Sequence, residues 1–462
     1  MNNQGKRIGI FMKLFRNEQT MHKAIKSVLN QTYTNFRFYI LISSKTKESV
    51  IKYAVMDSRI EVLDSQDKGG SIVDYAKYIA ADGNAYFTVI DADDWYQPDY
   101  LEEMINYAEC YHTDITACGN YFVNEYETRV GQRNQRRIVW QTEDTSDLLP
   151  YVYAFFRTIW GKLITSETVL KFKPEQFPNQ KQFGGYGGDT VFIFCLLIQT
   201  KKIGICEKIL YNYRMSATGG TYSLLEGRLN ADVFMFKFVY HSLEKLGTIK
   251  KKTEDFLYLV YGEALADTTT LLLKYDMSQD QRIENILYIY QKDLTIELFK
   301  RDHMGEWIEG INNYFVNRLY DMIFNYAEKI VLTKYIIEGY LHIFENLYNK
   351  WKNAFSTSEF EMLMTRKELL NSLVTEDYQD LFLKLLNVLK QEKLDKDEIK
   401  VCLNLLRRVS NSIALKQIFV DEKFVLVYEE LVKEINKGET VQAFKFLKNV
   451  FENERIPYQK KL

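Results

Sequence analysis

The chain has 462 residues, enough for two or three domains, and its 46% hydrophobic and 26% charged residues exclude a disordered or low-complexity protein. A net charge of −2 excludes the basic surface of a general nucleic-acid binder. The five cysteines form no close CxxC pair, so we expect neither disulfides nor a zinc site. This cysteine content favours a cytoplasmic location. No uncharged segment reaches the ~20 residues that cross a bilayer, which leaves only peripheral membrane contact open.

The first half of the chain alternates between strand and helix patterns. Apolar runs predict strands at 8–11, 38–42 and 86–90, and helical spacing predicts helices at 21–29 and 72–81. Strands separated by helices of this length predict an α/β fold with a parallel sheet. Ligands of such sheets bind beyond the carboxyl ends of the strands.

An acidic turn follows the strand predicted at 86–90. Asp91, Asp93 and Asp94 are three acids within four residues, and their repulsion is normally offset by a cation or by hydrogen-bond donors. Carboxylate oxygens suit Mg²⁺ or Mn²⁺, which prefer one or two carboxylates together with substrate phosphates. The alternative is an exposed acidic turn that caps a helix beginning near Pro98.

The second half of the chain has a helical pattern. It contains no proline from 179 to 456, and 16 of the 22 glycines lie at or before Gly227. Apolar stripes at steps of three and four run from Ile308 to Tyr326 and from Phe424 to Ile435. We therefore predict an all-α domain of roughly ten helices at 226–462, after an α/β domain at 1–225.

Several short motifs occur in the order found in one enzyme family. They are the stretch FRNE at 15–18, SVLNQTYTNF at 27–36, Gly69-Gly70, the acidic turn, WGKL at 160–163, Asp189-Thr190 and LYNYR at 210–214. The most specific is SVLNQTYTNF, since a Ser, Leu, Gln and Thr at this spacing between a helix and a strand rarely arise by chance. From about residue 5 to 222 the chain resembles the family 2 glycosyltransferases with the GT-A nucleotide-sugar fold. The helical half lies outside the resemblance.

The resemblance implies a binding site for a UDP-sugar and for Mn²⁺ or Mg²⁺. By this resemblance, the metal is bound by Asp93 and Asp91. The nucleotide-sugar is contacted by Phe15, Ser43, Asp91, Ala92 and Arg214. Two positions depart from the family pattern: Ser43-Ser44 replaces an Asp-Asp pair, and Val73-Asp74-Tyr75 replaces Ala-Arg-Asn. Serine hydroxyls still hydrogen-bond a pyrimidine edge, so we expect altered nucleotide contacts.

Asp189 stands where the family places its catalytic base. It follows four glycines at 184–188, which permit a close approach of the backbone to substrate. The alternative is a plain N-cap for the apolar run at 191–198. Gly188, Lys162, Trp95 and Trp160 complete the expected sugar and acceptor side, with core packing as the alternative for the two tryptophans.

The resemblance thus implies a cytoplasmic, metal-dependent, inverting glycosyltransferase. It would move a hexose, either galactose or glucose, from a UDP-sugar to a glycan acceptor. By the resemblance, this glycan is linked to a protein, as in the enzymes that elongate glycans on serine-rich adhesins. One alternative is a capsule or teichoic-acid transferase with a lipid-linked acceptor. Another is a catalytically dead GT-A scaffold for a partner transferase, which Ser43-Ser44 and Asp74 favour and which the intact Asp91, Asp93 and Asp189 oppose.

Overall fold

The computed structural model describes most of the first 300 residues of the chain. The described residues are 5–14, 18–43, 46–64, 70–173, 177–179, 183, 186–215, 224, 227–299, 301, 303–304 and 308–309. The chain divides into two compact units, one of residues 1–275 and 302–311 and one of residues 276–301 and 312–462.

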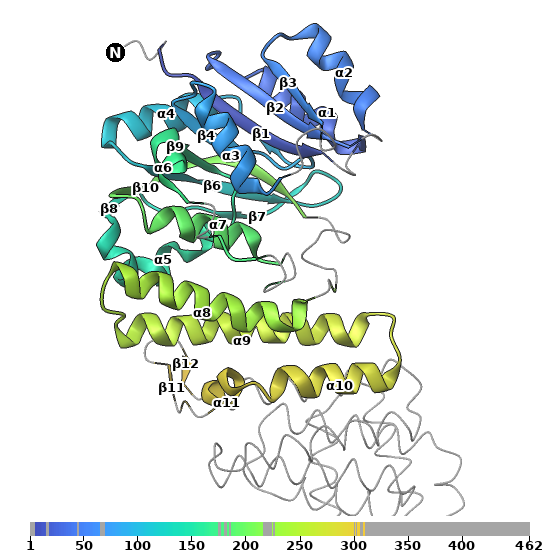
Figure 1. Ribbon diagram of the computed structural model, residues 1–462, viewed down its shortest axis with the longest axis vertical. Helices are drawn as coiled ribbons and strands as arrows, with labels where there is room; N and C mark the ends of the chain where they lie inside the picture. The colour runs from blue at the N-terminus through green and yellow to red at the C-terminus, as the bar shows by residue number, and fades with distance from the viewer. Residues whose placement is uncertain are drawn as a thin grey trace, which may run out of the picture. The chain divides into compact units, whose positions relative to one another are not determined.

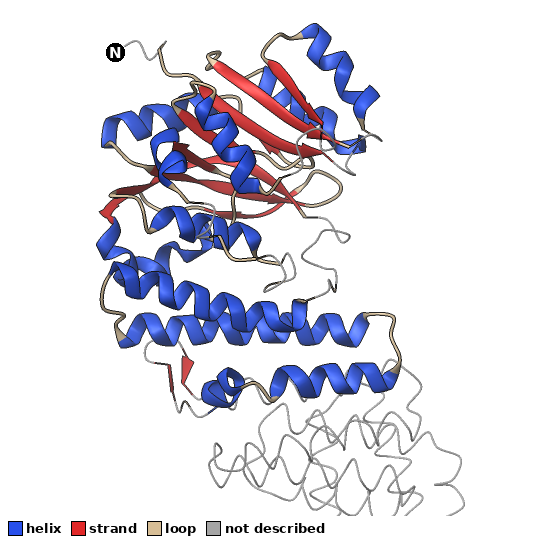
Figure 2. Cartoon of the chain, viewed as in Figure 1, coloured by secondary structure: helices blue, strands red, loops and turns tan. Residues whose placement is uncertain are grey.

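A ten-stranded mixed sheet forms the centre of the first unit (Figure 2). Its first half is parallel, with the order β3, β2, β1, β4; the strands are β1 (Ile8–Leu14), β2 (Phe36–Ile42), β3 (Ile60–Asp64) and β4 (Tyr86–Val89). Antiparallel β9 (Lys162–Thr165) joins β4 to β6 (Ile115–Val123), and β10 (Lys202–Arg214) runs parallel to β6. Three further strands pair antiparallel, β5 (Trp95–Tyr96) and β8 (Ile138–Gln141) with β10, and β7 (Arg129–Arg133) with β6.

Helices cover both faces of this sheet (Figure 1). One face packs on α1 (Glu18–Leu29) and α4 (Tyr100–Tyr111); the other packs on α3 (Ile72–Ala81), α5 (Thr145–Phe156), α6 (Ser166–Lys171) and α7 (Gly188–Leu197). Alternation along β1 explains the two layers, because Ile8, Ile10 and Met12 belong to the first core and Phe11 to the second. A short helix, α2 (Lys47–Met56), links β2 to β3, and a 3-10 turn (Thr142–Asp144) precedes α5. The predicted α/β fold class is confirmed, and the helix expected at 72–81 is α3.

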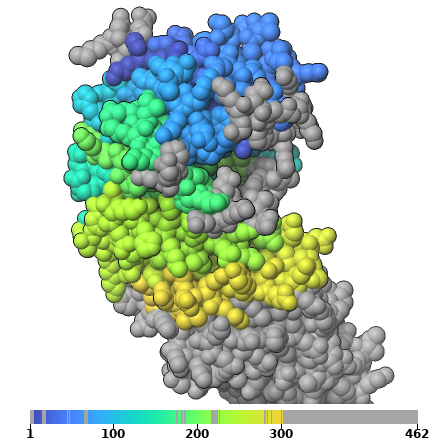
Figure 3. Space-filling model, viewed as in Figure 1, coloured from blue at the N-terminus to red at the C-terminus, as the bar shows by residue number. Residues whose placement is uncertain are grey.

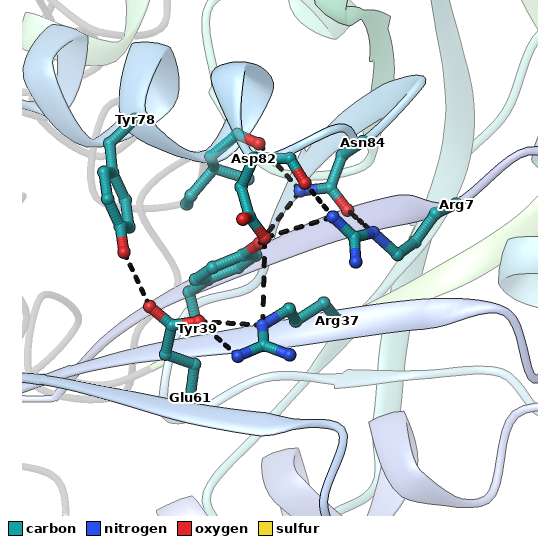
Figure 4. Close-up of polar contacts among 8 residues, drawn as sticks. Arg7, Arg37, Tyr39, Glu61, Tyr78, Asp82 and Asn84 are labelled. Carbon is teal, nitrogen blue, oxygen red and sulfur yellow. Dashed lines mark hydrogen bonds and ion pairs between the residues drawn. The ribbon is translucent and has the colours of Figure 1, made fainter.

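A polar network closes the amino end of the parallel strands (Figure 4). Arg7 donates to Asn84 Oδ1 at 2.9 Å, and Asn84 Nδ2 donates to the Tyr39 hydroxyl at 2.9 Å. Arg37 pairs with Glu61 at 2.7 Å, and Tyr39 also donates to Asp82 at the end of α3. The candidate site lies at the opposite end of these strands, where Asp91 follows β4.

The first unit continues past the boundary predicted at residue 225. Helices α8 (Arg228–Leu246) and α9 (Lys251–Lys274) follow, and Val239, Leu243 and Leu257 belong to the same core as α5 and α7. In the space-filling view the yellow-green atoms of α8 and α9 lie directly against the green part of the chain that precedes them (Figure 3). These two helices therefore pack as part of the sheet domain.

The structure describes only part of the region predicted as helical beyond α9. The second unit contains α10 (Gln279–Tyr290) and α11 (Asp293–Phe299) among the described residues. Two short strands, β11 (His303–Met304) and β12 (Ile308–Glu309), pair in the first unit, so a helix beginning at Ile308 was wrong. The remainder of both predicted stripes lies outside the described residues. Within the described ranges, no helix combines the length and apolar character needed to span a bilayer.

Candidate active site

The end of β10 fixes the acidic turn that follows β4. The Asp91 backbone N–H donates to the Tyr211 hydroxyl at 3.2 Å, and that hydroxyl donates to Asp94 Oδ2 at 2.8 Å. The Arg214 backbone N–H donates to Asp94 Oδ1 at 2.7 Å, and Arg214 Nε donates to the Asp93 carbonyl at 3.1 Å. Asp94 is therefore a structural member of the turn, held by the LYNYR segment.

The motif SVLNQTYTNF holds the same loop from the side of α1. Gln31 is buried, and its Nε2 donates to the Ser27 and Gln97 carbonyls at 2.9 and 2.7 Å. Its Oε1 accepts from the Leu101 N–H at 2.9 Å, while Ser27 Oγ accepts from the Tyr96 N–H at 3.1 Å. The most specific motif of the sequence thus positions the segment that carries the aspartates.

The remaining carboxylates of the site repel one another. Desolvation, followed by the charges of Asp189 and Asp93, raises the pKa of Asp91 to about 8. Desolvation also raises the pKa of Asp93, against the opposing charge of Arg214. Contacts connect Asp91 and Asp189: Tyr211, which binds the Asp91 N–H, stacks on Trp160, and the adjacent Ile159 N–H donates to Asp189 at the start of α7.

Two of these carboxylates fit a divalent metal. Asp94 is occupied by Tyr211 and Arg214, whereas the Asp91 carboxylate accepts no hydrogen bond from the described residues. Across the described ranges, no group of three or more His, Cys, Asp or Glu side chains is arranged to hold a metal ion. Asp91 and Asp93 thus suit a cation such as Mg²⁺ that completes its shell with water and substrate phosphates.

Asp189 lies in the first turn of α7 and is not its N-cap. The N-cap is Gly187, with a left-handed φ of 76°, and Asp189 is the second residue of the helix. Asp189 Oδ2 accepts from the Ile159 N–H at 3.3 Å, and the side chain is exposed. Desolvation by the surrounding protein raises its pKa, while the Ile159 hydrogen bond and the Lys162 charge oppose the shift. Asp189 is therefore an accessible carboxylate in a partly desolvated environment.

The glycine that this helix start requires is Gly187 rather than Gly188. A Cβ on Gly187 would lie 2.8 Å from Met235 Sδ, in addition to the left-handed φ. A Cβ on Gly188 would meet Phe183 at an ordinary 3.6 Å. The sequence indicates a glycine-rich stretch, but which position requires glycine depends on Met235 of α8.

Trp160 and Lys162 are buried beneath the site. The Trp160 ring stacks on Tyr211 at 4.7 Å and on Tyr213 at 5.1 Å, as expected for core packing. Lys162 Nζ donates to Thr158 Oγ1 at 3.0 Å and to the Trp160 carbonyl at 2.8 Å. Burial, followed by the charge of Arg133, lowers the pKa of Lys162 to about 7. Neither side chain presents a free surface for a sugar.

Trp95 and Arg214 belong to an ion-paired cluster on the other side of the acidic turn. Lys23 Nζ lies 3.6 Å from the centre of the half-buried Trp95 ring, and the Arg214 guanidinium lies 5.2 Å from it. Glu127, at the tip of the β6–β7 hairpin, pairs with Lys23 at 2.6 Å and with Arg214 at 2.8 Å. The Arg214 charge is thus already met by Glu127.

The other predicted nucleotide contacts are only partly described. Phe15 and Ser44 lie outside the described residues. Ser43 follows β2, where its N–H donates to Thr46 Oγ1 at 3.1 Å, and Ala92 is buried within the acidic turn. Asp74, which departs from the family pattern, forms a capping box with Ser71 at the start of α3. A local structural role therefore accounts for Asp74.

Residues 10–166 match the family model described as glycosyl transferase family 2. EpsH of Bacillus subtilis, which is named as a glycosyltransferase, is 26% identical over 216 residues, which are 45% of this chain and 60% of EpsH. Glycosyltransferase GlyA of Streptococcus pneumoniae is 30% identical over 125 residues, which are 26% of this chain and 18% of GlyA. The chain thus spans less than two thirds of either relative. The solved structure of S. aureus TarS 1–349 in complex with UDP-GlcNAc matches 75% of this chain and 90% of its own, with 11% identity and a TM-score of 0.40. Residues 10–166 of this chain are thus similar to the family 2 glycosyltransferases, and they include β4, the acidic turn and the motif SVLNQTYTNF, whereas β10 lies beyond them.

Proposed function

We propose that this chain is a metal-dependent, inverting glycosyltransferase of the cytoplasm. It moves a hexose, galactose or glucose, from a UDP-sugar to a glycan acceptor. The match of residues 10–166 to the family 2 glycosyl transferase model supports the class of reaction. The sugar, the metal and the protein-linked acceptor follow from the resemblance of its motifs.

One observation carries the proposal: Asp91 and Asp189 interact although they lie far apart in the sequence. The Tyr211 hydroxyl binds the Asp91 N–H, its ring stacks on Trp160 at 4.7 Å, and the Ile159 N–H next to Trp160 donates to Asp189 at 3.3 Å. The charge of Asp189 also contributes to raising the pKa of Asp91 to about 8. The hydrogen bond from Tyr211 to Asp94 positions the acidic turn in the absence of substrate. Two carboxylates for a cation and a third for a proton are the groups that sugar transfer needs.

Donor binding falls to the acidic turn. A divalent cation held by Asp93 and Asp91 would neutralise the charge that develops on the departing diphosphate. Ser43, at the carboxyl end of β2, lies at the edge of the sheet expected to receive the nucleotide. Its hydroxyl is suited to hydrogen-bond the pyrimidine edge.

Proton transfer falls to Asp189. Oδ2 accepts the Ile159 N–H, which orients the carboxylate and leaves Oδ1 for the acceptor hydroxyl. The hydroxyl gives its proton to Asp189 as its oxygen bonds to the anomeric carbon. The bond from that carbon to the diphosphate oxygen breaks, and its electron pair leaves with UDP. Because the oxygen attacks opposite the leaving group, the anomeric configuration inverts.

The test is incubation of the full chain with a panel of UDP-sugars and Mn²⁺, with UDP release as the readout. We expect release from UDP-galactose or UDP-glucose that stops when the metal is chelated. With an acceptor, proton NMR of the product should show a β-linkage from an α-linked donor. An absence of both UDP release and UDP binding would support the scaffold alternative, and an α-linked product would overturn the single displacement.

A further inference from the structure

Two arginines at the carboxyl end of α5 have no carboxylate partner among the described residues. Arg133, the last residue of β7, is half-buried, and its single hydrogen bond to the described part of the chain runs from NH1 to the Ala154 carbonyl at 2.7 Å. Arg157, which follows α5, is exposed, and its guanidinium forms no ion pair or hydrogen bond within those same ranges. A guanidinium removed from water without an anion is costly, so Arg133 in particular has unused capacity to bind one.

The segment that follows α5 connects these arginines to the start of α7. The Arg157 carbonyl accepts from Thr190 Oγ1 at 2.9 Å, next to the Ile159 N–H that donates to Asp189. The Arg133 guanidinium lies 5.8 Å from the centre of the Trp160 ring. The segment from Ala154 to Trp160 therefore contacts the Arg133 guanidinium, contains Arg157 and donates a hydrogen bond to Asp189.

The charges around this segment are unbalanced. Burial, followed by the charge of Arg157, lowers the pKa of Arg133 to about 10, so Arg133 remains cationic at neutral pH. The charge of Arg133 in turn contributes to lowering the pKa of Lys162, whereas Asp189 opposes that shift. The charges of Arg133 and Arg157 thus repel each other, and a bound anion would relieve this repulsion.

We propose that Arg133 and Arg157 form a binding site for an anionic group, a phosphate or a carboxylate, of the acceptor. The planar guanidinium presents paired N–H donors that match either anion. The site lies on the side of Asp189, the base for the acceptor hydroxyl, whereas the acidic turn that faces the donor has its own cation, Arg214, paired with Glu127. Only the identification of the anion with the acceptor, and not the presence of an anion site, rests on the proposed function.

The experiment is a ³¹P NMR titration of inorganic phosphate into the full chain, once alone and once saturated with UDP and Mg²⁺. We expect saturable phosphate binding in both titrations, because the donor diphosphate occupies a different site. Arg157→Gln and Arg133→Gln should each weaken this binding by about tenfold or more, the effect of losing a charge-assisted hydrogen bond. Arg157 is exposed, so its variant keeps the test valid if Arg133→Gln fails to fold.

Arg129→Gln is the matched control. Arg129 also lies on β7, but its guanidinium is 3.7 Å from the Tyr121 ring, whereas that of Arg133 is 5.4 Å from the ring of Phe122. Tyr121 and Phe122 are consecutive residues of β6 and face opposite sides of the sheet, so the two arginines also lie on opposite sides. Arg129→Gln should therefore bind phosphate as the wild type does. Displacement of phosphate by UDP would assign the anion to the donor and overturn the proposal. Equal binding by wild type and Arg157→Gln, or an absence of saturable binding, would also overturn it. Failure of UDP release with intact phosphate binding would contradict the proposed function alone.

Discussion

The Tyr211 hydroxyl donates to Asp94 Oδ2 at 2.8 Å and accepts from the Asp91 backbone N–H at 3.2 Å. One side chain of β10 thus holds both ends of the acidic turn. The positions of Asp91 and Asp93 in this turn therefore depend on this buried hydroxyl.

Tyr211→Phe removes that hydroxyl and keeps the ring that stacks on Trp160. A buried carboxylate oxygen and a backbone N–H lose their partner, so we expect the free energy of unfolding to fall by about 1–3 kcal/mol. Thermal denaturation followed by circular dichroism measures the loss. An unchanged melting temperature would mean that water replaces the hydroxyl without cost.

Asp93→Asn and Asp94→Asn should separate metal binding from structure. Asp93→Asn is expected to abolish the metal dependence of UDP binding and to leave the melting temperature unchanged, since no hydrogen bond from another residue to its carboxylate is described. Asp94→Asn is expected to lower the melting temperature, because its amide cannot accept from both Tyr211 and the Arg214 N–H. Calorimetric titration of UDP with and without Mn²⁺ measures the first effect. Equal, metal-independent affinity in wild type and Asp93→Asn would contradict a metal at Asp93.

Gly187→Ala should destabilise the start of α7. Alanine there adopts a strained φ of 76° and contacts Met235 Sδ at 2.8 Å, so a loss of about 1–3 kcal/mol is expected. Gly188→Ala is the control, with ordinary space for its Cβ and a helical position that favours alanine by roughly 0.5–1 kcal/mol. Similar melting temperatures for the two variants would contradict this assignment of the required glycine.

Lys162 should make folding stability dependent on pH. Its ordinary pKa of 10.5 applies to the unfolded chain, whereas its pKa in the folded protein is about 7. Between these values the unfolded chain binds more protons, so the free energy of unfolding rises with pH by up to about 1.4 kcal/mol per unit and is flat below pH 7. Lys162→Met removes the titrating group. Melting temperatures of wild type and variant from pH 6 to 10 should therefore diverge above pH 7, and parallel curves would show that Lys162 titrates normally.

Local patterns predicted the sheet domain well. The helix at 72–81 follows from apolar spacing and ends at the predicted residues, because α3 packs one face on the core. Contacts between residues distant in the sequence could not be predicted from local patterns. Gln31 belongs to a recognisable motif, but its partners Gln97 and Leu101 lie far along the chain. Trp160 was a candidate for sugar stacking, and only its packing on Tyr211 reveals a core residue.

The helical half was predicted less well for a related reason. Glycine and proline content indicates where helices lie, but it does not indicate which core they join. Val239 and Leu243 have the same apolar character in either case, and only their contacts assign α8 to the sheet domain. The N-cap alternative for Asp189 failed similarly, because the left-handed φ of Gly187 starts the helix two residues earlier.

The rate of UDP release from a UDP-sugar by Asp189→Asn, compared with wild type at saturating donor and Mn²⁺, tests the central claim most directly. Asparagine keeps the shape of the side chain and an oxygen for the Ile159 N–H, but it cannot take a proton from the attacking hydroxyl. We predict that UDP binding persists while the rate falls by about 10²–10⁴-fold, the usual contribution of a general base. A rate near that of the wild type would contradict the assignment of Asp189 as the catalytic base.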